Sequence, residues 1–149
     1  MTTPAGAIAA PRSRAVAAWL ALVGGGLGLH RFYLHGPRDL WAWLHPWPTF
    51  VGAYGFWRMR EFGVDDARGS LLVPVLGVML VATMLQAIVY GLASDERWAA
   101  RHGRAAAALQ RGWLTYAAVI IALAVGTSVA VATIAFTAQR YFESRVAIS

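Results

Sequence analysis

The sequence contains no cysteine and no lysine, and seven acidic residues stand against 13 basic ones, all of them arginine. The lack of cysteine excludes disulfide bonds, thiolate metal sites and cysteine nucleophiles. Only 13% of the residues are charged and 58% are hydrophobic, whereas soluble domains are about 25% charged and about 45–50% apolar. A water-soluble fold of 149 residues could not hide that much apolar surface. The composition therefore predicts a membrane protein.

The arginines are spread along the chain rather than gathered on one element, and they lie in every stretch between apolar segments. Proteins that bind nucleic acid usually cluster their basic residues on one face. Arginines that flank apolar segments instead meet anionic lipid headgroups at the membrane surface. We therefore expect membrane lipids, and no nucleic acid, among the partners of this chain.

The sequence contains four apolar segments, at residues 15–29, 40–57, 70–92 and 113–136. They predict an all-α membrane protein with four transmembrane helices. The first segment is too short to cross a hydrocarbon layer of about 30 Å, so we expect its helix to include some of residues 30–34. This continuation places Arg31 near the far headgroups. A cleavable signal peptide is the alternative, but no small-residue cleavage site follows the apolar run.

The second apolar segment is rich in aromatic residues and is interrupted by Pro46 and Pro48. These prolines should kink the helix or delay its regular part until after Pro48, and a re-entrant path stays open. Tryptophan collects at the membrane–water boundary, where its ring is apolar and its N–H stays hydrated. We expect four interfacial residues of this kind, Trp41, Trp43, Trp47 and Trp57.

The two later apolar segments carry no charged residue, and the last one repeats small residues at a spacing of four. Small side chains let another helix approach closely. The first segment has a shorter version of this pattern in Gly24 and Gly28. The expected packing positions of the last segment are Ala118, Ala122, Gly126 and Ala130.

A basic helical loop is predicted at residues 94–112, inside a second pair of transmembrane helices at residues 70–136. Ser94 can cap this helix. Three arginines then fall on one face, at Arg97, Arg101 and Arg104. The helix either rests on anionic lipid or forms a solvated loop, because its apolar side is mostly alanine.

The two ends of the chain, residues 1–14 and 137–149, are predicted to be a flexible basic N-terminal tail and a C-terminal tail. With four spans, seven arginines lie on one side of the membrane and six on the other. A difference of one does not set the orientation.

A glycine-rich apolar helix is followed by the turn sequence His30-Arg31-Phe32-Tyr33-Leu34, with Gly36 beyond it. The next helix closes with Gly55-Phe56-Trp57, and Glu61 is the acidic residue after it. This pattern over residues 15–61 resembles the TM2 domain family. The resemblance implies a hairpin of two transmembrane helices and a domain that generally has no assigned biochemical activity.

Three residues depart from the family's pattern. His35 is inserted between the usual Leu and Gly, and Met59 and Arg60 stand where apolar residues are expected. The end of the second helix is therefore more polar than the family pattern.

No motif in the sequence indicates catalysis. The glycines do not have the G-x-G-x-x-G spacing, and no strand precedes them. The seven acids lie in loops or at helix ends. The four histidines lack an acidic partner nearby in sequence, and they lie on different faces or elements, at His30, His35, His45 and His102. We therefore expect no enzyme, no cofactor and no metal site.

Arg31 is the polar residue that most suggests a function within the predicted hairpin. Its guanidinium can donate hydrogen bonds to a lipid phosphate, or to Asp39 across the turn. The alternative is that Arg31 only anchors the end of a helix.

Two hypotheses for function follow. The first is a non-enzymatic membrane protein that acts through helix–helix or lipid contacts, with a protein partner or with copies of itself. The alternative is a component of an oligomeric channel or transporter, for which Gln86 is the most polar side chain in the uncharged spans. Arginine in place of lysine and abundant alanine favour a GC-rich bacterial genome, so the expected location is the bacterial inner membrane.

Overall fold

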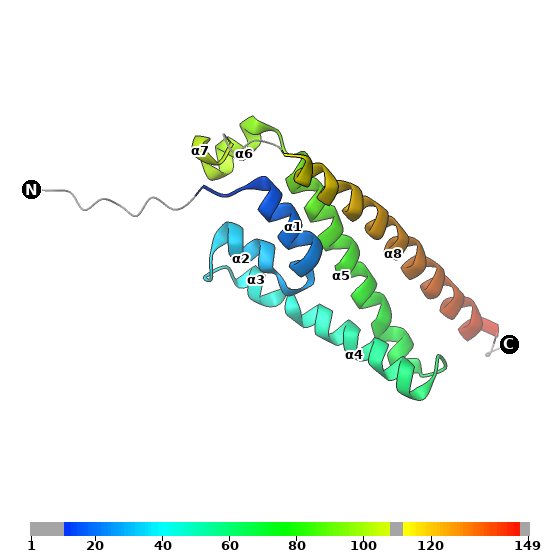
Figure 1. Ribbon diagram of the computed structural model, residues 1–149. Helices are drawn as coiled ribbons and strands as arrows, with labels where there is room; N and C mark the ends of the chain where they lie inside the picture. The colour runs from blue at the N-terminus through cyan, green and yellow to red at the C-terminus, as the bar shows by residue number, and fades with distance from the viewer. Residues whose placement is uncertain (1–10, 108–111, 147–149) are drawn as a thin grey trace, which may run out of the picture.

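The computed structural model describes residues 11–107 and 112–146, and all regular structure in this part of the chain is helical. The elements are α1 (Arg14–Gly24), the 3-10 helix η1 (Gly25–Leu27), α2 (Leu29–His35), α3 (Leu40–Leu44), α4 (Pro46–Phe62), α5 (Ala67–Leu92), α6 (Asp95–His102), α7 (Arg104–Ala107) and α8 (Trp113–Val146) (Figure 1).

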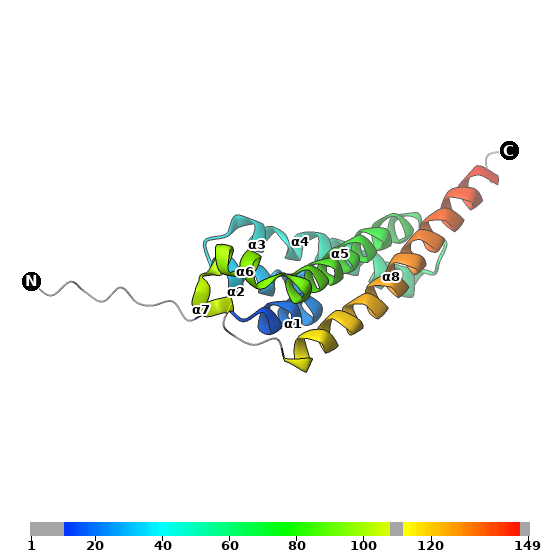
Figure 2. The same ribbon diagram turned by 90° about the horizontal axis from the view of Figure 1, so that it is seen from above.

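The two longest helices, α5 and α8, lie side by side and form the frame of the molecule (Figures 1 and 2). Both are long and apolar enough to cross a membrane, and α1 with η1 is a shorter apolar helix. The uncharged runs predicted these two helices. The prediction of four spans goes further than the structure, which has two such helices in its described part.

Helices α1 and α4 cover different halves of α5. The end of α1 and η1 approach the second half, where Gly25 faces Thr83. α4 packs along the first half, where Gly55 leaves so little room that a Cβ atom would lie 2.5 Å from the Cβ atom of Leu72. A glycine at this position therefore allows the two helices to touch.

One end of the molecule, which we name the α6 end, contains α6 together with the beginnings of α1 and α8. Trp98 of α6 is 3% exposed and donates a hydrogen bond from Nε1 to the Arg12 carbonyl, at 2.9 Å. Arg14 donates to the Ala93 carbonyl at 2.9 Å and forms an ion pair with Asp95. These contacts join the start of α1 to the segment that follows α5.

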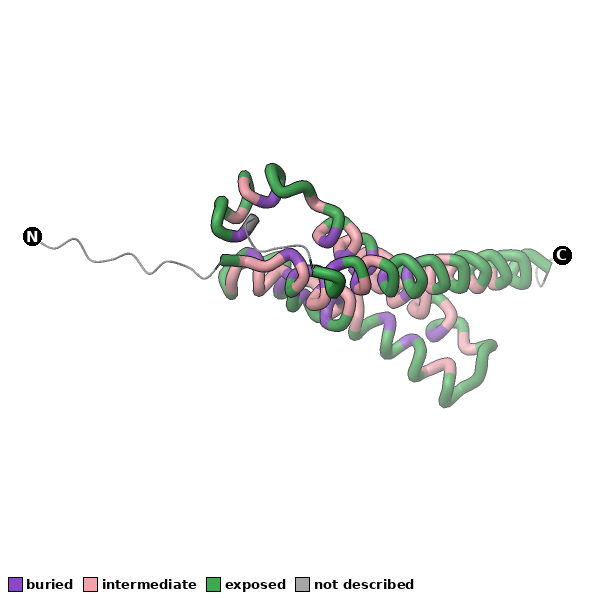
Figure 3. Tube along the Cα trace, turned by 45° about the horizontal axis from the view of Figure 1, so that its top comes forward, coloured by how far each residue is buried: buried purple, intermediate pink, exposed green. Residues whose placement is uncertain are grey.

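The opposite end, which we name the α4 end, contains the turn between α4 and α5 and the last part of α8. Arg140 of α8 lies 3.7 Å from Asp65 in this turn. The helix therefore runs from the α6 end to the α4 end. Most of its surface is exposed along this path, and its buried positions lie on one face (Figure 3).

Several element boundaries differ from those expected. α4 begins at Pro46, because proline fits the first turn of a helix, where no N–H partner is needed. α5 begins at Ala67 because Asp66 caps it by accepting a 2.7 Å hydrogen bond from Gly69 N. α8 continues through the expected C-terminal tail to Val146, supported by a hydrogen bond of 2.8 Å from Gln139 to Glu143 and one of 2.7 Å from Arg140 to Glu143.

Candidate functional site

The chain reverses direction at Gly28, between η1 and α2. Gly28 has a φ of +75°, in the left-handed region that favours glycine, and a Cβ atom here would lie 2.6 Å from the Ala42 carbonyl oxygen. Beyond it, α2 runs back along α1, so that the Tyr33 hydroxyl accepts a 2.8 Å hydrogen bond from Ser13 N–H. Leu34 of α2 also shares a core cluster with Trp98 of α6. The Ser13–Tyr33 hydrogen bond and this cluster together place α2 at the α6 end.

The prediction that the first helix continues unbroken through residues 30–34 is wrong, whereas the position of Arg31 near the far headgroups stays a prediction. The physical reason is Gly28, which ends the helix by its left-handed backbone. Gly28 is accordingly a reversal point, and it also lies in close contact with the Ala42 carbonyl of α3. Gly24 is buried at the end of α1, against the Leu29 side chain of the returning segment.

A side chain of α4 satisfies the backbone of this reversal. Thr49 donates a hydrogen bond of 2.7 Å from Oγ1 to the Gly26 carbonyl. A broken helix is tolerated at membrane depth only where other groups bind its freed backbone atoms. Thr49 therefore satisfies one of the backbone carbonyls that the break in the helix leaves free.

His30, the first side chain of the turn motif, is completely buried just after the reversal. Its ring lies against two other aromatic rings, with centroid distances of 5.5 Å to His45 and 5.8 Å to Tyr90. Gln86 of α5 lies beside the same ring. The fold thus brings together four side chains, one from α2, one from the α3–α4 junction and two from α5. We name this group, in which His30 is buried and the others are partly buried, the His30 cluster.

Three polar atoms of the His30 cluster have no hydrogen-bond partner within the described part of the chain. They are both ring nitrogens of His30 and Oε1 of Gln86. A buried polar atom without a partner costs about 1–3 kcal/mol. Water that bridges such atoms is the usual remedy in proteins. Within the His30 cluster, the Gln86 side chain is the group that lies within hydrogen-bonding reach of the His30 ring.

Sequence reasoning treated the histidines separately and missed this cluster. Among the described residues, no group of three or more His, Asp or Glu side chains comes together as metal ligands would. His35 lies apart, 3.7 Å from Asp39, and His102 stacks on Trp98 at 4.3 Å between ring centroids. The only signal in the sequence was Gln86, a polar residue in an otherwise apolar helix.

The turn between α2 and α3 is closed by an ion pair. Arg31 donates a hydrogen bond of 2.9 Å from Nε to Asp39, which also caps α3 by accepting from Trp41 N–H at 3.1 Å. The Arg31 hydrogen bond, aided by that of Trp41, lowers the pKa of the Asp39 carboxyl. We considered two hydrogen-bond acceptors for Arg31, a lipid phosphate and Asp39. The acceptor present in the structure is the Asp39 carboxylate.

The other turn-motif residues also lie in this region. Phe32 packs edge-on against Trp43, with ring centroids 5.2 Å apart. Gly36 follows α2 with a φ of +84°. Trp43 also donates a hydrogen bond of 3.0 Å from Nε1 to the Pro37 carbonyl.

The turn between α4 and α5 repeats the same arrangement. Arg58 donates two hydrogen bonds of 2.8 Å to Asp66, eight residues later, and Gly63 between them has a φ of +88°. The Arg58 hydrogen bonds, aided by that of Gly69 N–H, lower the pKa of Asp66 from 3.8 to about 2. Each turn therefore pairs an arginine with the aspartate that caps the next helix.

The small residues of α8 lie at the contact with α5. Ala118 and Ala122 are completely buried, and Gly126 is buried where a Cβ atom would lie 2.9 Å from the Cβ atom of Met84. Ala130 is partly exposed and lines a groove beside this contact. These positions pack within the chain.

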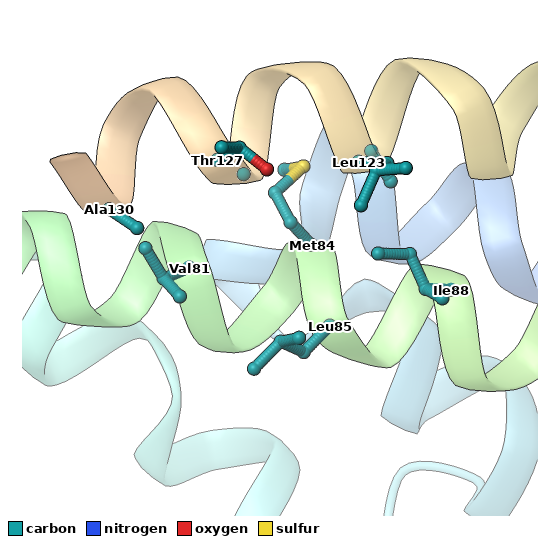
Figure 4. A pocket seen from close by; sticks show the side chains of 9 residues that line it. Val81, Met84, Leu85, Ile88, Leu123, Thr127 and Ala130 are labelled. Atoms are coloured by element: carbon teal, nitrogen blue, oxygen red, sulfur yellow. The ribbon is translucent and has the colours of Figure 1, made fainter.

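An apolar groove runs beside the α5–α8 contact. Figure 4 shows Met84 reaching from α5 toward α8, with Leu123 and Thr127 opposite it. The groove has a volume of about 140 Å³ here, and a wider apolar groove continues past Ala130 to Ile134. Its lining is almost entirely apolar, so it suits a lipid chain or another apolar helix.

The four expected interfacial tryptophans point outward. Each is at least half exposed in the isolated chain: Trp41, Trp43, Trp47 and Trp57. This exposure allows contact with the membrane–water boundary.

Comparison with families of known proteins matches residues 10–61 to the TM2 domain, which confirms the resemblance and begins it at residue 10. The matched segment includes the reversal at Gly28, the Arg31–Asp39 turn and α4 as far as Glu61. No curated protein and no solved structure matches the chain.

Proposed function

Because residues 10–61 form a TM2 domain and α5 and α8 are candidate membrane helices, we propose that the chain is a non-enzymatic, multi-pass membrane protein that acts through contacts between helices. The observation that carries this proposal is the uncovered surface of α8. Leu123 and Ile134 are 58% and 69% exposed beside the apolar groove. A helix of a protein partner, or α8 of a second copy, is the occupant that fits this surface.

The proposed path through the membrane differs from four simple spans. The reversal at Gly28 supports a re-entrant unit of α1, η1 and α2, which enters and leaves at the α6 end. The chain then crosses three times, through α3 with α4, through α5 and through α8. Four spans remain the alternative, in which the N-terminal residues lie on the other side from the Gly36 turn.

This path also suggests an orientation. With three crossings, seven of the 12 arginines in the described residues belong to segments at the α6 end and five to segments at the α4 end. An excess of arginine marks the cytoplasmic side. We therefore place the α6 end in the cytoplasm, with the bacterial inner membrane as the proposed location.

Site-directed crosslinking tests the proposed helix contact, and a chain without cysteine suits it. Single variants Leu123→Cys and Ile134→Cys place a thiol beside the groove, and Ser128→Cys places one on another exposed part of α8. In native membranes we expect crosslinked products from the first two variants and few from the third. Equal products from all three variants, or none from any, would contradict the proposal.

The His30 cluster favours a second candidate function, a polar path for a solute or a proton through an oligomer. Ionisable groups inside a membrane usually mark such pathways. In liposomes that contain the purified protein, a flux that His30→Phe and Gln86→Leu abolish would favour this candidate. A flux unchanged by both substitutions would remove it.

A further inference from the structure

A small pocket lies at the α6 end, between the last turns of α5 and the side of α6. Its walls are Val89 and Tyr90 from α5, and Arg97, Trp98, Arg101 and His102 from α6. The pocket has a volume of about 120 Å³. One water takes about 30 Å³ in the liquid, so the space accommodates a group the size of phosphate.

The charge around this pocket is positive. Arg97 and Arg101 are exposed, stand one helical turn apart, and form no ion pair with an acidic side chain of the described residues. Two further arginines act electrostatically on the pocket walls, Arg12 on His102 and Arg31 on Tyr90.

Two acidic residues lie close by, at the start of α6. Asp95 forms an ion pair with Arg14, and Glu96 is exposed to solvent. Neither of these carboxylates forms an ion pair with Arg97 or Arg101 of the pocket wall.

His102 completes the wall. Its Nδ1 atom is buried, and the Trp98 backbone lies within reach of the imidazole ring. The imidazole ring is held against Trp98, whose own N–H is already bound to the Arg12 carbonyl. Two arginines line this cavity, and guanidinium donors suit an oxygen anion.

We propose that this pocket binds a phosphate group, and that its source is the headgroup of an anionic phospholipid. Val89 lies on the exposed side of α5 next to the pocket, so an acyl chain attached to the bound phosphate can lie along that apolar helix. The inference uses the proposed membrane placement of α5, but it does not depend on the proposed helix contact of α8.

The test measures lipid retention by the full-length protein in detergent, using native mass spectrometry. The variant Arg97→Gln/Arg101→Gln is compared with Arg60→Gln/Arg68→Gln, which removes two exposed arginines at the α4 end. An arginine near a membrane surface contributes roughly a fivefold affinity for anionic lipid. We therefore expect the first variant to lose about 25-fold in affinity for phosphatidylglycerol and the control to lose little.

Three further measurements complete the test. Phosphatidylcholine should be retained less well than phosphatidylglycerol, and Arg97→Lys/Arg101→Lys should restore part of the binding. Added inorganic phosphate tests the source of the bound group. If it displaces the lipid, the site accepts both free phosphate and a lipid headgroup; if it has no effect, the site accepts the lipid headgroup alone. Equal lipid retention by wild type and the Arg97→Gln/Arg101→Gln variant, with both folded by thermal melting, would overturn the proposal. The lipid-retention test is independent of the α8 crosslinking test, so a failure of the crosslinks would not change how lipid retention is interpreted.

Discussion

The Tyr33 hydroxyl accepts a 2.8 Å hydrogen bond from the backbone N–H of Ser13, although these residues lie on either side of a segment expected to cross the membrane. The Tyr33 carbonyl also accepts from Arg12 Nε at 3.0 Å. The end of the turn motif thus lies beside the start of α1. The first apolar helix therefore enters the molecule and returns, rather than passing from one end to the other.

Substitution of Gly28 by alanine tests the reversal. A left-handed backbone costs an L-residue about 1–2 kcal/mol, and contact with the Ala42 carbonyl adds to this. We expect Gly28→Ala to lower the free energy of unfolding in detergent by about 2–4 kcal/mol. Gly112→Ala is the matched control, because a Cβ atom at Gly112 meets nothing within 4 Å. Equal stability of the two variants would contradict the reversal.

Substitution of Gly126 tests the contact between α5 and α8. Isoleucine here would press against Met84 on the buried face, and overpacking typically costs about 1–3 kcal/mol. Ala124→Ile adds the same kind of side chain to the exposed face of α8. We expect Gly126→Ile to lower the thermal unfolding midpoint in detergent and Ala124→Ile to leave it nearly unchanged. Similar midpoints for both variants would show that Gly126 does not lie in a close contact.

The pH dependence of stability tests the Arg58–Asp66 pair. The pKa of Asp66 is lower in the folded protein than its ordinary value of 3.8, so the folded state holds its proton less tightly. The stabilisation is therefore fully present above about pH 4 and is lost as the pH falls through about 2. Asp66→Asn should reduce the fall in thermal midpoint across this window, and Asp65→Asn should not. An identical fall in Asp66→Asn and wild type would contradict the pairing.

Replacement of His30 by leucine separates a structural from a functional role. The substitution removes two buried nitrogens without partners among the described residues, and an apolar replacement of unpaired groups is nearly neutral or stabilising. We expect the thermal unfolding midpoint of His30→Leu in detergent to be unchanged or higher. His35→Leu, at an exposed position, is the control. A loss above about 1 kcal/mol for His30→Leu alone would show that bound groups already satisfy the ring.

The sequence predicted α5 and α8 because each contains an uncharged apolar run of spanning length. It also predicted the cap at Ser94, which depends on local spacing alone. It could not predict the reversal, because a glycine in an apolar run is compatible with a continued helix or a left-handed break. The contacts that fix Gly28 come from α3 and the α3–α4 junction.

The His30 cluster was equally beyond the sequence. His30 and Gln86 meet only because α2 returns toward α5, and this return depends on the reversal. The sequence left the helix that contains Trp98 either on lipid or in solvent, and in the fold Trp98 is buried in one cluster with Leu34 and Ala17. A tryptophan on a short amphipathic helix has the same sequence pattern whether the helix rests on lipid or packs against the protein. Only the fold distinguishes these two cases.

The most direct test of this account is the sidedness of three single cysteines in intact cells, measured with a membrane-impermeant maleimide. The variants are Pro11→Cys before α1, Arg38→Cys in the Gly36 turn and Val64→Cys in the Gly63 turn, all at exposed positions. A chain that returns at Gly28 predicts that Pro11→Cys and Arg38→Cys share one side and Val64→Cys lies on the other. Labelling that pairs Pro11→Cys with Val64→Cys, opposite Arg38→Cys, would contradict it.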